Sequence, residues 1–193
     1  MTTDLRTKSL RRRALTLALA ALCIVGATGS GLAAPIQIAV TGDSNVAGKG
    51  VSSSETYPAQ LGRALKAKGY DVRVLNTGVN GDTTTGLLGR LASAVPEGTQ
   101  IAIVWIGIND VRRQGKSVSF VQEMRRKITA NLRARGIEVL NLKRDAGTGV
   151  RSDPKFTTGD RDMHFNAAGY ARVVARTLPQ VEGLIRKVGR KRR

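Results

Sequence analysis

One serine and one histidine form a pair that could transfer an acyl group. Ser44 follows a short apolar run and ends the tripeptide Gly-Asp-Ser at positions 42–44. His164, the only histidine of the chain, comes about 120 residues later, just before a helical pattern. A serine hydroxyl needs a neighbouring base at neutral pH, and histidine is the side chain whose unperturbed pKa lies near that pH. We therefore predict a serine nucleophile with a histidine base. The simpler alternative is a histidine that only packs or caps at the start of the last helix.

The elements that would hold this pair alternate between short apolar runs and helical patterns. Near-continuous apolar runs at 36–40, 72–75, 101–106 and 137–142 are typical of strands buried on both faces. Apolar residues recur at helical spacing within 57–65, 88–95, 121–132 and 170–178. Strands that alternate with helices predict a parallel sheet of four to five strands in a three-layer α/β/α sandwich.

Polar loops follow the first three predicted strands, and a parallel sheet brings such loops to one edge. Ser44 lies in the first loop, Gly81 in the second and Asn109 in the third. Acyl transfer needs donors fixed around the developing oxyanion, and the candidates are the N–H groups of Ser44 and Gly81 and the side-chain amide of Asn109. An asparagine can present its NH2 while neighbours hold its carbonyl. Each loop alone could be a turn or a helix cap. Together, in this order, they predict an oxyanion hole.

The same segments resemble the sequence blocks of the SGNH (GDSL-type) hydrolase superfamily. Residues 42–44 resemble its nucleophile block, 76–83 its glycine block, 107–110 its asparagine block and 164–170 its histidine block. The likeness runs from about residue 36 to residue 184 and is greatest to the bacterial arylesterase and lysophospholipase branch. It implies a flavodoxin-like SGNH hydrolase fold and a carboxylic ester hydrolase. It also implies catalytic roles for Ser44 and His164, an oxyanion hole of Ser44, Gly81 and Asn109, and neither a metal nor another cofactor.

Two positions depart from the family pattern. Asn45 stands where leucine or isoleucine usually follows the serine, which alters the pocket wall or adds a polar contact. Arg161 stands three positions before His164, where the family has its acidic residue, and two aspartates flank it. We predict that Asp162 orients His164, because it is closer in the chain, with Asp160 as the alternative acid. A Ser-His dyad held by a backbone carbonyl and a degenerate, inactive homologue remain open.

The first 34 residues differ in composition from the rest. Arginines at 11–13 precede an apolar run at 14–25 and a small-residue segment that ends in Ala33, Ala34 and Pro35. This order is typical of a secretory signal peptide, here with cleavage near Ala33. The apolar run is well short of the roughly 20 residues that span a bilayer. We predict a signal peptide at 1–34, an exported hydrolase domain at 35–185, periplasmic or extracellular, and a basic tail at 186–193.

The chain is strongly basic. Its formal net charge is +18, of which residues 1–34 contribute five cations and one anion, so the remainder carries +14. Six cations crowd positions 186–193, without aromatic residues on which bases could stack. We expect a solvated, frayed end. In an exported protein its candidate contacts are anionic lipid or polysaccharide, and no nucleic acid is expected.

The leading functional hypothesis is a secreted serine esterase. It would hydrolyse short- or medium-chain, aryl or lysophospholipid esters through an acyl-enzyme. Three phenylalanines, three tyrosines and one tryptophan leave little material for a deep acyl tunnel, so we expect a shallow site. A carbohydrate acetyl esterase would use the same residues. A basic binding module for anionic surfaces that keeps the fold without turnover is the alternative from another class. The sequence indicates no oligomeric state.

Overall fold

The computed structural model describes residues 34–142, 147, 149–162 and 164–192. The chain divides into two compact units, Met1–Ala34 and Pro35–Arg193. Apart from Ala34, the predicted signal peptide lies outside the described residues, so export stays a prediction. In the described part of the chain, no helix is both long and apolar enough to cross a membrane.

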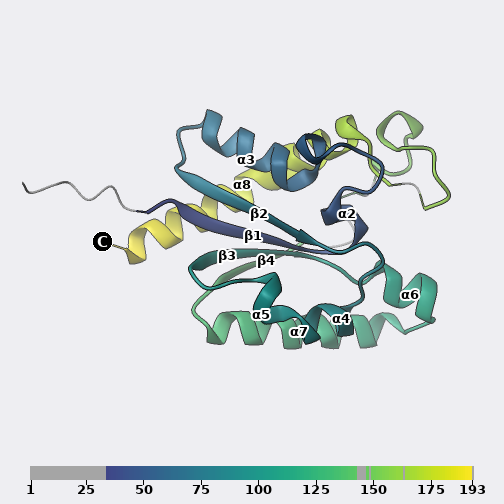
Figure 1. Ribbon diagram of the computed structural model, residues 1–193, viewed down its shortest axis with the longest axis horizontal. Coiled ribbons are helices and arrows are strands. Elements are labelled where there is room, and N and C mark those ends of the chain that lie inside the picture. The colour runs from purple at the N-terminus through teal and green to yellow at the C-terminus, as the bar shows by residue number, and fades with distance from the viewer. Residues whose placement is uncertain (1–33, 143–146, 148, 163, 193) are drawn as a thin grey trace, which may run out of the picture. The chain divides into compact units, whose positions relative to one another are not determined.

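Four parallel strands form a sheet in the order β2-β1-β3-β4 (Figure 1). The chain adds β2 on one side of β1 and then crosses over to add β3 on the other side. Such a reversal opens a crevice outside the carboxyl ends of the strands, here those of β1 and β3. The predicted parallel α/β sandwich is confirmed, with four strands among the described residues. The strands are β1 (Ile36–Gly42), β2 (Val72–Gly78), β3 (Thr99–Trp105) and β4 (Glu138–Asn141).

Helices cover both faces of the sheet (Figure 1). The two helices on one face are α3 (Tyr57–Ala67) and α8 (Ala167–Lys191), and the opposite face carries α4 (Thr84–Gly89), α5 (Leu91–Ala94) and α7 (Val118–Ala134). The helical pattern predicted over 88–95 is divided at Arg90, which separates α4 from α5. Two short helices follow the ends of β1 and β3, namely α2 (Ser44–Ala47) and α6 (Ile108–Gln114). Single 3-10 turns lie at η1 (Ser53–Glu55) and η3 (Pro154–Phe156).

Each face of the sheet has its own apolar core, because successive strand residues point to opposite faces. In β1, Ile38 and Val40 pack with the α3 and α8 side, whereas Ala39 packs with the α4, α5 and α7 side. In β3, Ile103 packs with the α3 and α8 side, and Val104 packs with the α4, α5 and α7 side. Burial on both faces explains why these strands appear in the sequence as uninterrupted apolar runs.

The carboxyl ends of β1 and β3 approach closely at Gly42. This residue pairs with Gly78 of β2 and with Trp105 of β3. A Cβ at position 42 would lie 1.9 Å from the Trp105 carbonyl oxygen, so only glycine fits between the strands. The next two residues, Asp43 and Ser44, are thereby delivered to the crevice.

The basic C-terminal segment is more ordered than predicted. Helix α8 continues to Lys191, past the predicted domain boundary at residue 185. Lys187 and Lys191 each lie 2.7 Å from the carboxylate of Glu138 on β4. Residues 186–191 are therefore the last turns of a helix that is tied to the sheet, not a frayed tail. Contact of this end with anionic lipid or polysaccharide stays a prediction.

Candidate active site

Ser44 occupies the first position of α2, directly after β1. Asp43 caps this helix, and its carboxylate accepts the backbone N–H and the side-chain amide of Asn45, both at 2.9 Å. Ser44 is buried and 7% exposed. Because N–H groups in the first turn of a helix have no acceptor within it, the Ser44 N–H is presented at the same place as its hydroxyl.

His164 contacts Ser44 from the far end of the chain. Its Nε2 lies 2.9 Å from Ser44 Oγ, and its Nδ1 contacts the carboxylate of Asp160. With the proton on Nδ1 and donated to Asp160, Nε2 can accept the serine hydroxyl. His164 is buried, and the next residue, Phe165, packs its ring 5.8 Å from that of Trp105. The structure therefore brings the predicted pair into hydrogen-bonding geometry.

The carboxylate against His164 belongs to Asp160, and the structure does not place Asp162 there. Asp160 also accepts the backbone N–H of His164 at 2.8 Å. Asp162 instead pairs with Arg113 of α6 at 3.3 Å. The chain turns back so that the Thr158 N–H donates to the His164 carbonyl at 2.8 Å, and this turn directs Asp160 inward. We predicted Asp162 because it is closer to His164 along the chain. The turn instead brings the carboxylate of Asp160, the alternative acid, against the imidazole.

Asp160 carries a negative charge across the neutral range. Desolvation raises the pKa of its carboxyl. The hydrogen bonds from the backbone and ring of His164 outweigh this effect and lower the pKa to about 2. A carboxylate at Nδ1 favours the tautomer needed at Nε2 and stabilises an imidazolium. The dyad arrangement, with a backbone carbonyl holding the ring, is not the one observed.

The glycine and asparagine loops contact each other, and Asn109 lies beside Ser44. Asn109 donates from Nδ2 to the Asp82 carbonyl at 2.8 Å and lines a small pocket with Ser44 and His164. From the sequence we expected neighbours to hold the side-chain carbonyl of Asn109. In the structure it is one N–H of the side-chain NH2 that is held, by the Asp82 carbonyl. The second N–H of that NH2 is the one able to serve a substrate oxygen. Gly81 precedes Asp82 with a left-handed φ of 80°, which favours glycine there.

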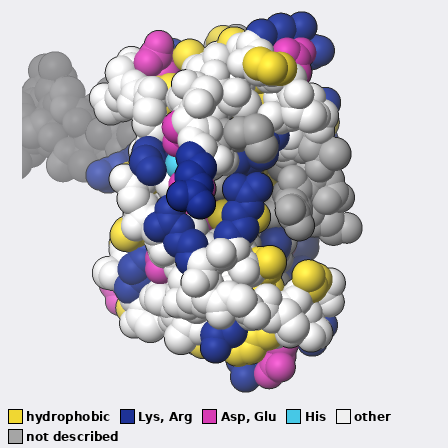
Figure 2. All heavy atoms as spheres, turned by 90° about the vertical axis from the view of Figure 1, so that its right-hand side faces the viewer, with side chains coloured by type: hydrophobic (Ala, Val, Ile, Leu, Met, Phe, Trp, Pro, Cys, Tyr) yellow, Lys and Arg dark blue, Asp and Glu magenta, His cyan; other side chains and the backbone are white. Residues whose placement is uncertain are grey.

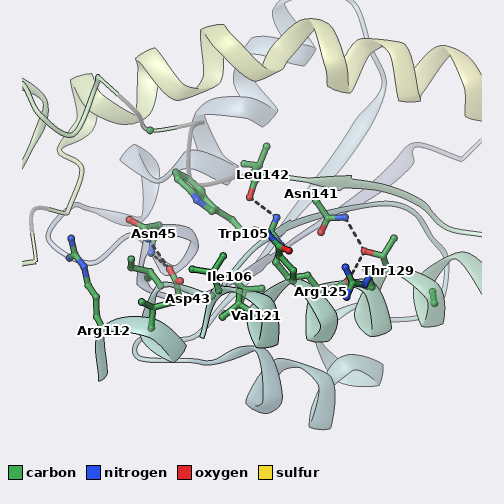
Figure 3. Close-up of a pocket in the computed structure, with 18 of the residues that line it drawn as sticks. Asp43, Asn45, Trp105, Ile106, Arg112, Val121, Arg125, Thr129, Asn141 and Leu142 are labelled. Atoms are coloured by element: carbon green, nitrogen blue, oxygen red, sulfur yellow. Dashed lines mark hydrogen bonds between the residues drawn. The ribbon is translucent and has the colours of Figure 1, made fainter. Parts of the chain in front are cut away.

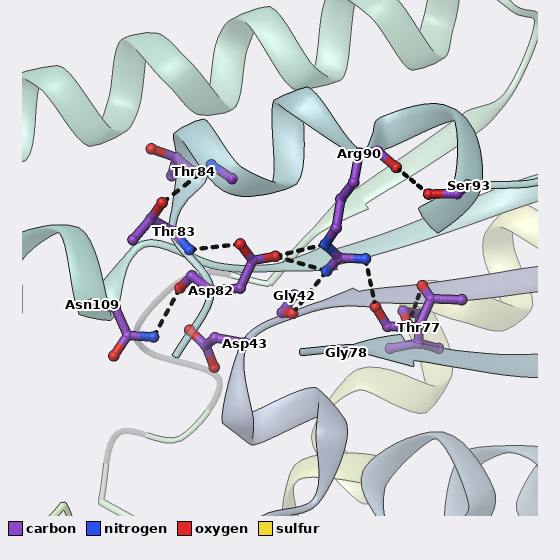
Figure 4. A network of polar contacts seen from close by, with 12 residues as sticks. Gly42, Asp43, Thr77, Gly78, Asp82, Thr83, Thr84, Arg90, Ser93 and Asn109 are labelled. Atoms are coloured by element: carbon purple, nitrogen blue, oxygen red, sulfur yellow. Dashed lines mark hydrogen bonds and ion pairs between the residues drawn. The ribbon is translucent and has the colours of Figure 1, made fainter. Parts of the chain in front are cut away.

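Arg90 ties three strand-end segments together (Figure 4). Its guanidinium donates to the Asp82 carboxylate at 2.7 and 2.9 Å, to the Thr77 carbonyl at 3.0 Å and to the Gly42 carbonyl at 3.3 Å. One side chain thus fixes the ends of β1 and β2 and the loop that follows β2. Sequence reasoning missed Arg90, because an arginine within an amphipathic pattern carries no signal of such a role.

A second missed contact joins α6 to α4. The fully buried carboxylate of Asp110 accepts the Thr84 N–H at 3.0 and 3.2 Å and also contacts the Thr84 hydroxyl. Asp110 therefore holds the segment next to Asn109 against the start of α4. The sequence offered a helix cap as the simple explanation of Asp110, and the structure shows a tie between loops.

Asn45 connects Asp43 to Arg151. Its Oδ1 accepts Arg151 Nη2 at 2.8 Å, while its amide group donates to Asp43. Arg151 also donates to the Asp162 carbonyl at 3.0 Å and lies 4.5 Å above the ring of Phe165. Burial raises the pKa of Asp43 to about 6, against the lowering effects of Asn45 and Arg151. The departure from the family pattern at position 45 thus adds a polar contact, and the sequence did not identify Arg151 as its partner.

A cavity of about 920 Å³ adjoins these residues (Figure 3). Asp43, Asn45 and Arg112 lie at one end, and Thr129 and Asn141 lie toward the other. This volume is within the range of small-molecule sites. The large apolar side chains among its described lining residues are Trp105, Ile106, Ile108, Val111, Val118, Val121 and Leu142.

The contact chain from carboxylate to imidazole to serine, at the carboxyl edge of a parallel α/β sheet, is the arrangement of a serine hydrolase. Residues 40–158 match the GDSL-like lipase/acylhydrolase family, and the chain belongs to this family. It is a carboxylic ester hydrolase of the SGNH type.

Two relatives are esterases by name. The chain is 32% identical over 144 residues to Esterase TesA of Pseudomonas aeruginosa, an alignment that covers 74% of this chain and 67% of the relative. It is 29% identical over 136 residues to the Arylesterase of Vibrio mimicus, which covers 67% of this chain and 62% of the relative. The aligned part is thus about two thirds of either relative.

Solved structures share the fold. The crystal structure of TesA has a TM-score of 0.67 at 24% identity and covers 77% of this chain and 99% of that chain. AlinE4, an SGNH-hydrolase family esterase, has a TM-score of 0.58 at 27% identity and covers 77% and 96%. A family 3 carbohydrate esterase of Clostridium thermocellum, at 16% identity and a TM-score of 0.55, shares the fold alone.

Proposed function

We propose that this protein is an exported serine esterase that cleaves carboxylic esters through an acyl-enzyme. The observation that carries the proposal is the continuous contact from Asp160 through His164 to Ser44. A base held in one tautomer beside a serine hydroxyl is what activates that hydroxyl for attack. The inactive binding-module alternative is disfavoured, because the substitution of Arg161 at the family's acidic position has not removed a carboxylate from the imidazole.

In the proposed reaction Ser44 Oγ attacks the ester carbonyl while His164 Nε2 takes its proton. Asp160 stabilises the imidazolium, which then protonates the departing alkoxide as the tetrahedral intermediate collapses. The oxyanion is stabilised by the N–H groups of Ser44 and Gly81 and by the second amide N–H of Asn109. Water, activated by the same imidazole, attacks the acyl-enzyme and releases the acid, which restores the serine.

We assign short- and medium-chain acyl and aryl esters as the substrate class. The partly apolar cavity beside Ser44 supports this assignment, as does the likeness to a relative named Arylesterase. The likeness to a carbohydrate esterase is one of fold only, so carbohydrate acetyl esters form the comparison set rather than a second proposal. Export rests on the sequence of residues 1–34. It is tested by fractionating cells that express the full chain and sequencing the N-terminus of the recovered protein: recovery only from the cytoplasm would contradict export, and an intact N-terminus on exported protein would contradict cleavage near Ala33.

The deciding experiment is hydrolysis of a p-nitrophenyl ester series by the wild-type protein and by Ser44→Ala. We expect wild-type turnover on short and medium chains and a loss of several powers of ten in the variant, since loss of a nucleophile is rarely compensated. Circular dichroism and thermal unfolding provide the control for folding. Retention of more than about a hundredth of wild-type turnover would exclude the serine mechanism. Acetylated xylan or chitin oligomers in the same assay test the carbohydrate alternative.

A further inference from the structure

Arginines dominate the polar lining of the cavity beside Ser44. Among its described lining residues, Asp43 is the one carboxylate, and it lies at the Ser44 end. The cations are Arg112 of α6, Arg125, Arg126 and Arg133 of α7, and Arg151. Such an excess of one charge in a concave, partly apolar lining attracts ligands of the opposite charge.

Two of these arginines reach the small pocket that holds the reacting groups. Arg112 and Arg151 line that pocket together with Ser44 and His164. Figure 2 shows Lys and Arg side chains gathered around the histidine on this face. Burial lowers the pKa of Arg151, and the nearby charge of Arg112 lowers it further. Because both residues line this small pocket, their positive charges repel each other, and a bound anion in the pocket would relieve that repulsion.

The charge in the cavity is partly fixed in position. Asn45 and the Asp162 carbonyl hold Arg151, and the Leu142 carbonyl accepts Arg125 Nη2 at 2.8 Å. Burial also lowers the pKa of Arg125. Anchored guanidinium groups lose less conformational freedom when they bind a carboxylate or phosphate. On α7 the lining arginines at 125, 126 and 133 are spread over roughly 12 Å at 1.5 Å per residue, and those at 126 and 133, about two turns apart, lie on the same side of the helix.

We propose that this cavity is an anion-binding subsite, which selects esters that carry a carboxylate or phosphate group. The inference rests on the proposed function of Ser44, because the cavity shares Arg112 and Arg151 with the small pocket that holds the reacting groups. The anion can belong to the acyl or to the alcohol part of the ester, since the same guanidinium chemistry would recognise either. Hydrophobic lining near Trp105 accommodates the carbon chain between the ester and the anion.

The first test compares pairs of esters that differ in one charged group. On the acyl side the pair is p-nitrophenyl hydrogen adipate and p-nitrophenyl hexanoate, which differ by a terminal carboxylate in place of a methyl group. On the alcohol side it is the hexanoyl ester of 4-hydroxybenzoate and that of 4-hydroxybenzamide. In at least one pair we expect kcat/KM to favour the anionic ester by about tenfold or more at low salt, the order of a single charge-assisted hydrogen bond. The pair that shows the preference identifies the side that carries the anion.

Arg112→Gln is the diagnostic variant, and Arg186→Gln on α8 is its matched control. Both remove one exposed arginine, and Arg186 lines neither pocket. We expect Arg112→Gln to lower the ratio of anionic to neutral kcat/KM about fivefold or more, and added salt to lower it in the wild type. Arg186→Gln should keep the ratio within about twofold. Equal ratios in the wild type and in Arg112→Gln, or no preference in either pair, would overturn the subsite.

A binding measurement separates failure of the subsite from failure of the esterase. Trp105 is the only tryptophan of the chain and lines the cavity, so its fluorescence reports occupancy without turnover. We expect hexyl phosphate to bind the wild type at least about fivefold more tightly than it binds Arg112→Gln. Hexanol should bind the wild type more weakly than hexyl phosphate binds either protein. If no ester is cleaved but this titration holds, the esterase proposal fails and the subsite stands. If esters are cleaved through Ser44 while hexyl phosphate and hexanol titrate alike, the subsite fails and the esterase stands.

Discussion

The two sides of the candidate site are built in different ways. On the oxyanion side, Gly81 and Asn109 follow β2 and β3, and Arg90 and Asp110 tie these segments to the sheet and to each other. On the base side, His164 lies on a loop outside the sheet, and its polar contacts there are to Asp160 and Thr158 of the same loop.

This contrast teaches which parts of such a site tolerate change. Donors placed by strand ends cannot move without disturbing the register of the sheet. A loop closed by its own hydrogen bonds can shift by a residue, as it does here, where Arg161 takes the expected acidic position and Asp160 supplies the carboxylate. We therefore expect the base side to depend on the identity of one carboxylate and the oxyanion side to depend on many ties.

The largest expected effect is on the base side. Asp160→Asn should leave the fold intact but lower turnover by roughly a thousandfold or more, because the imidazole loses its tautomer bias and the charge that stabilises its protonated form. Asp162→Asn is the matched control and should stay within about threefold, since the carboxylate of Asp162 forms a partly exposed pair with Arg113 and the substitution keeps the backbone carbonyl that Arg151 contacts. Turnover of both variants on one ester across pH 5 to 9 is the measurement. The reverse pattern would return the role to Asp162.

On the oxyanion side we expect Asn109→Ala to lower kcat by roughly a hundredfold or more, with a modest change in KM, as for a donor whose bond strengthens in the transition state. Steady-state kinetics on a neutral ester provide both constants. An unchanged kcat would remove Asn109 from the oxyanion hole. A rise in KM alone would make it a substrate-binding group.

Asp43 lies where the two sides meet, and its raised pKa predicts a pH-dependent stability. Between about pH 4 and 6 the native carboxyl holds a proton that the unfolded chain has lost, so wild-type stability falls as the pH rises through this window. A shift from 3.8 to about 6 corresponds to at most about 3 kcal/mol, at 1.36 kcal/mol per pKa unit. Asp43→Asn removes this loss, so its stability relative to wild type should be greater at pH 7.5 than at pH 4. Urea unfolding of both proteins at the two pH values checks this, and parallel pH profiles would contradict it.

The smallest effect tests the ties themselves. Arg90→Gln removes the group that joins Asp82 to the Thr77 and Gly42 carbonyls, and we expect kcat to fall about tenfold as the glycine loop loosens. Arg63→Gln on α3 is the control, because the hydrogen bond of Arg63 within the described part of the chain is an exposed one, to the Ser54 carbonyl. Equal kcat values for the two variants would show that the oxyanion side does not need this tie.

Local sequence patterns predicted the sheet and the contacting pair of Ser44 and His164. The strands are buried on both faces and therefore appear as apolar runs, and a parallel sheet brings their following loops together. The residues that sequence reasoning misassigned or missed act through space. Asp160 depends on a turn within the loop, and Arg90 and Arg151 reach backbone or side-chain atoms far along the chain. The end of α8 was missed because a run of cations resembles a solvated tail until Glu138 is placed beside it.

The carboxylate of Asp160 holds both the ring and the main chain of His164, so the base and its loop form one unit. Such a unit can open locally while β1 to β4 remain paired, because the backbone hydrogen bonds of its described residues are made within the loop and not to the sheet. The amide proton of His164 should then exchange with solvent faster than those of Ile38 or Ile103 in the central strands. Activity should also decline at denaturant concentrations that leave the sheet folded. The resistance of this protein to inactivation would thus be set by the contacts of Thr158 and Asp160 with His164 rather than by its hydrophobic core.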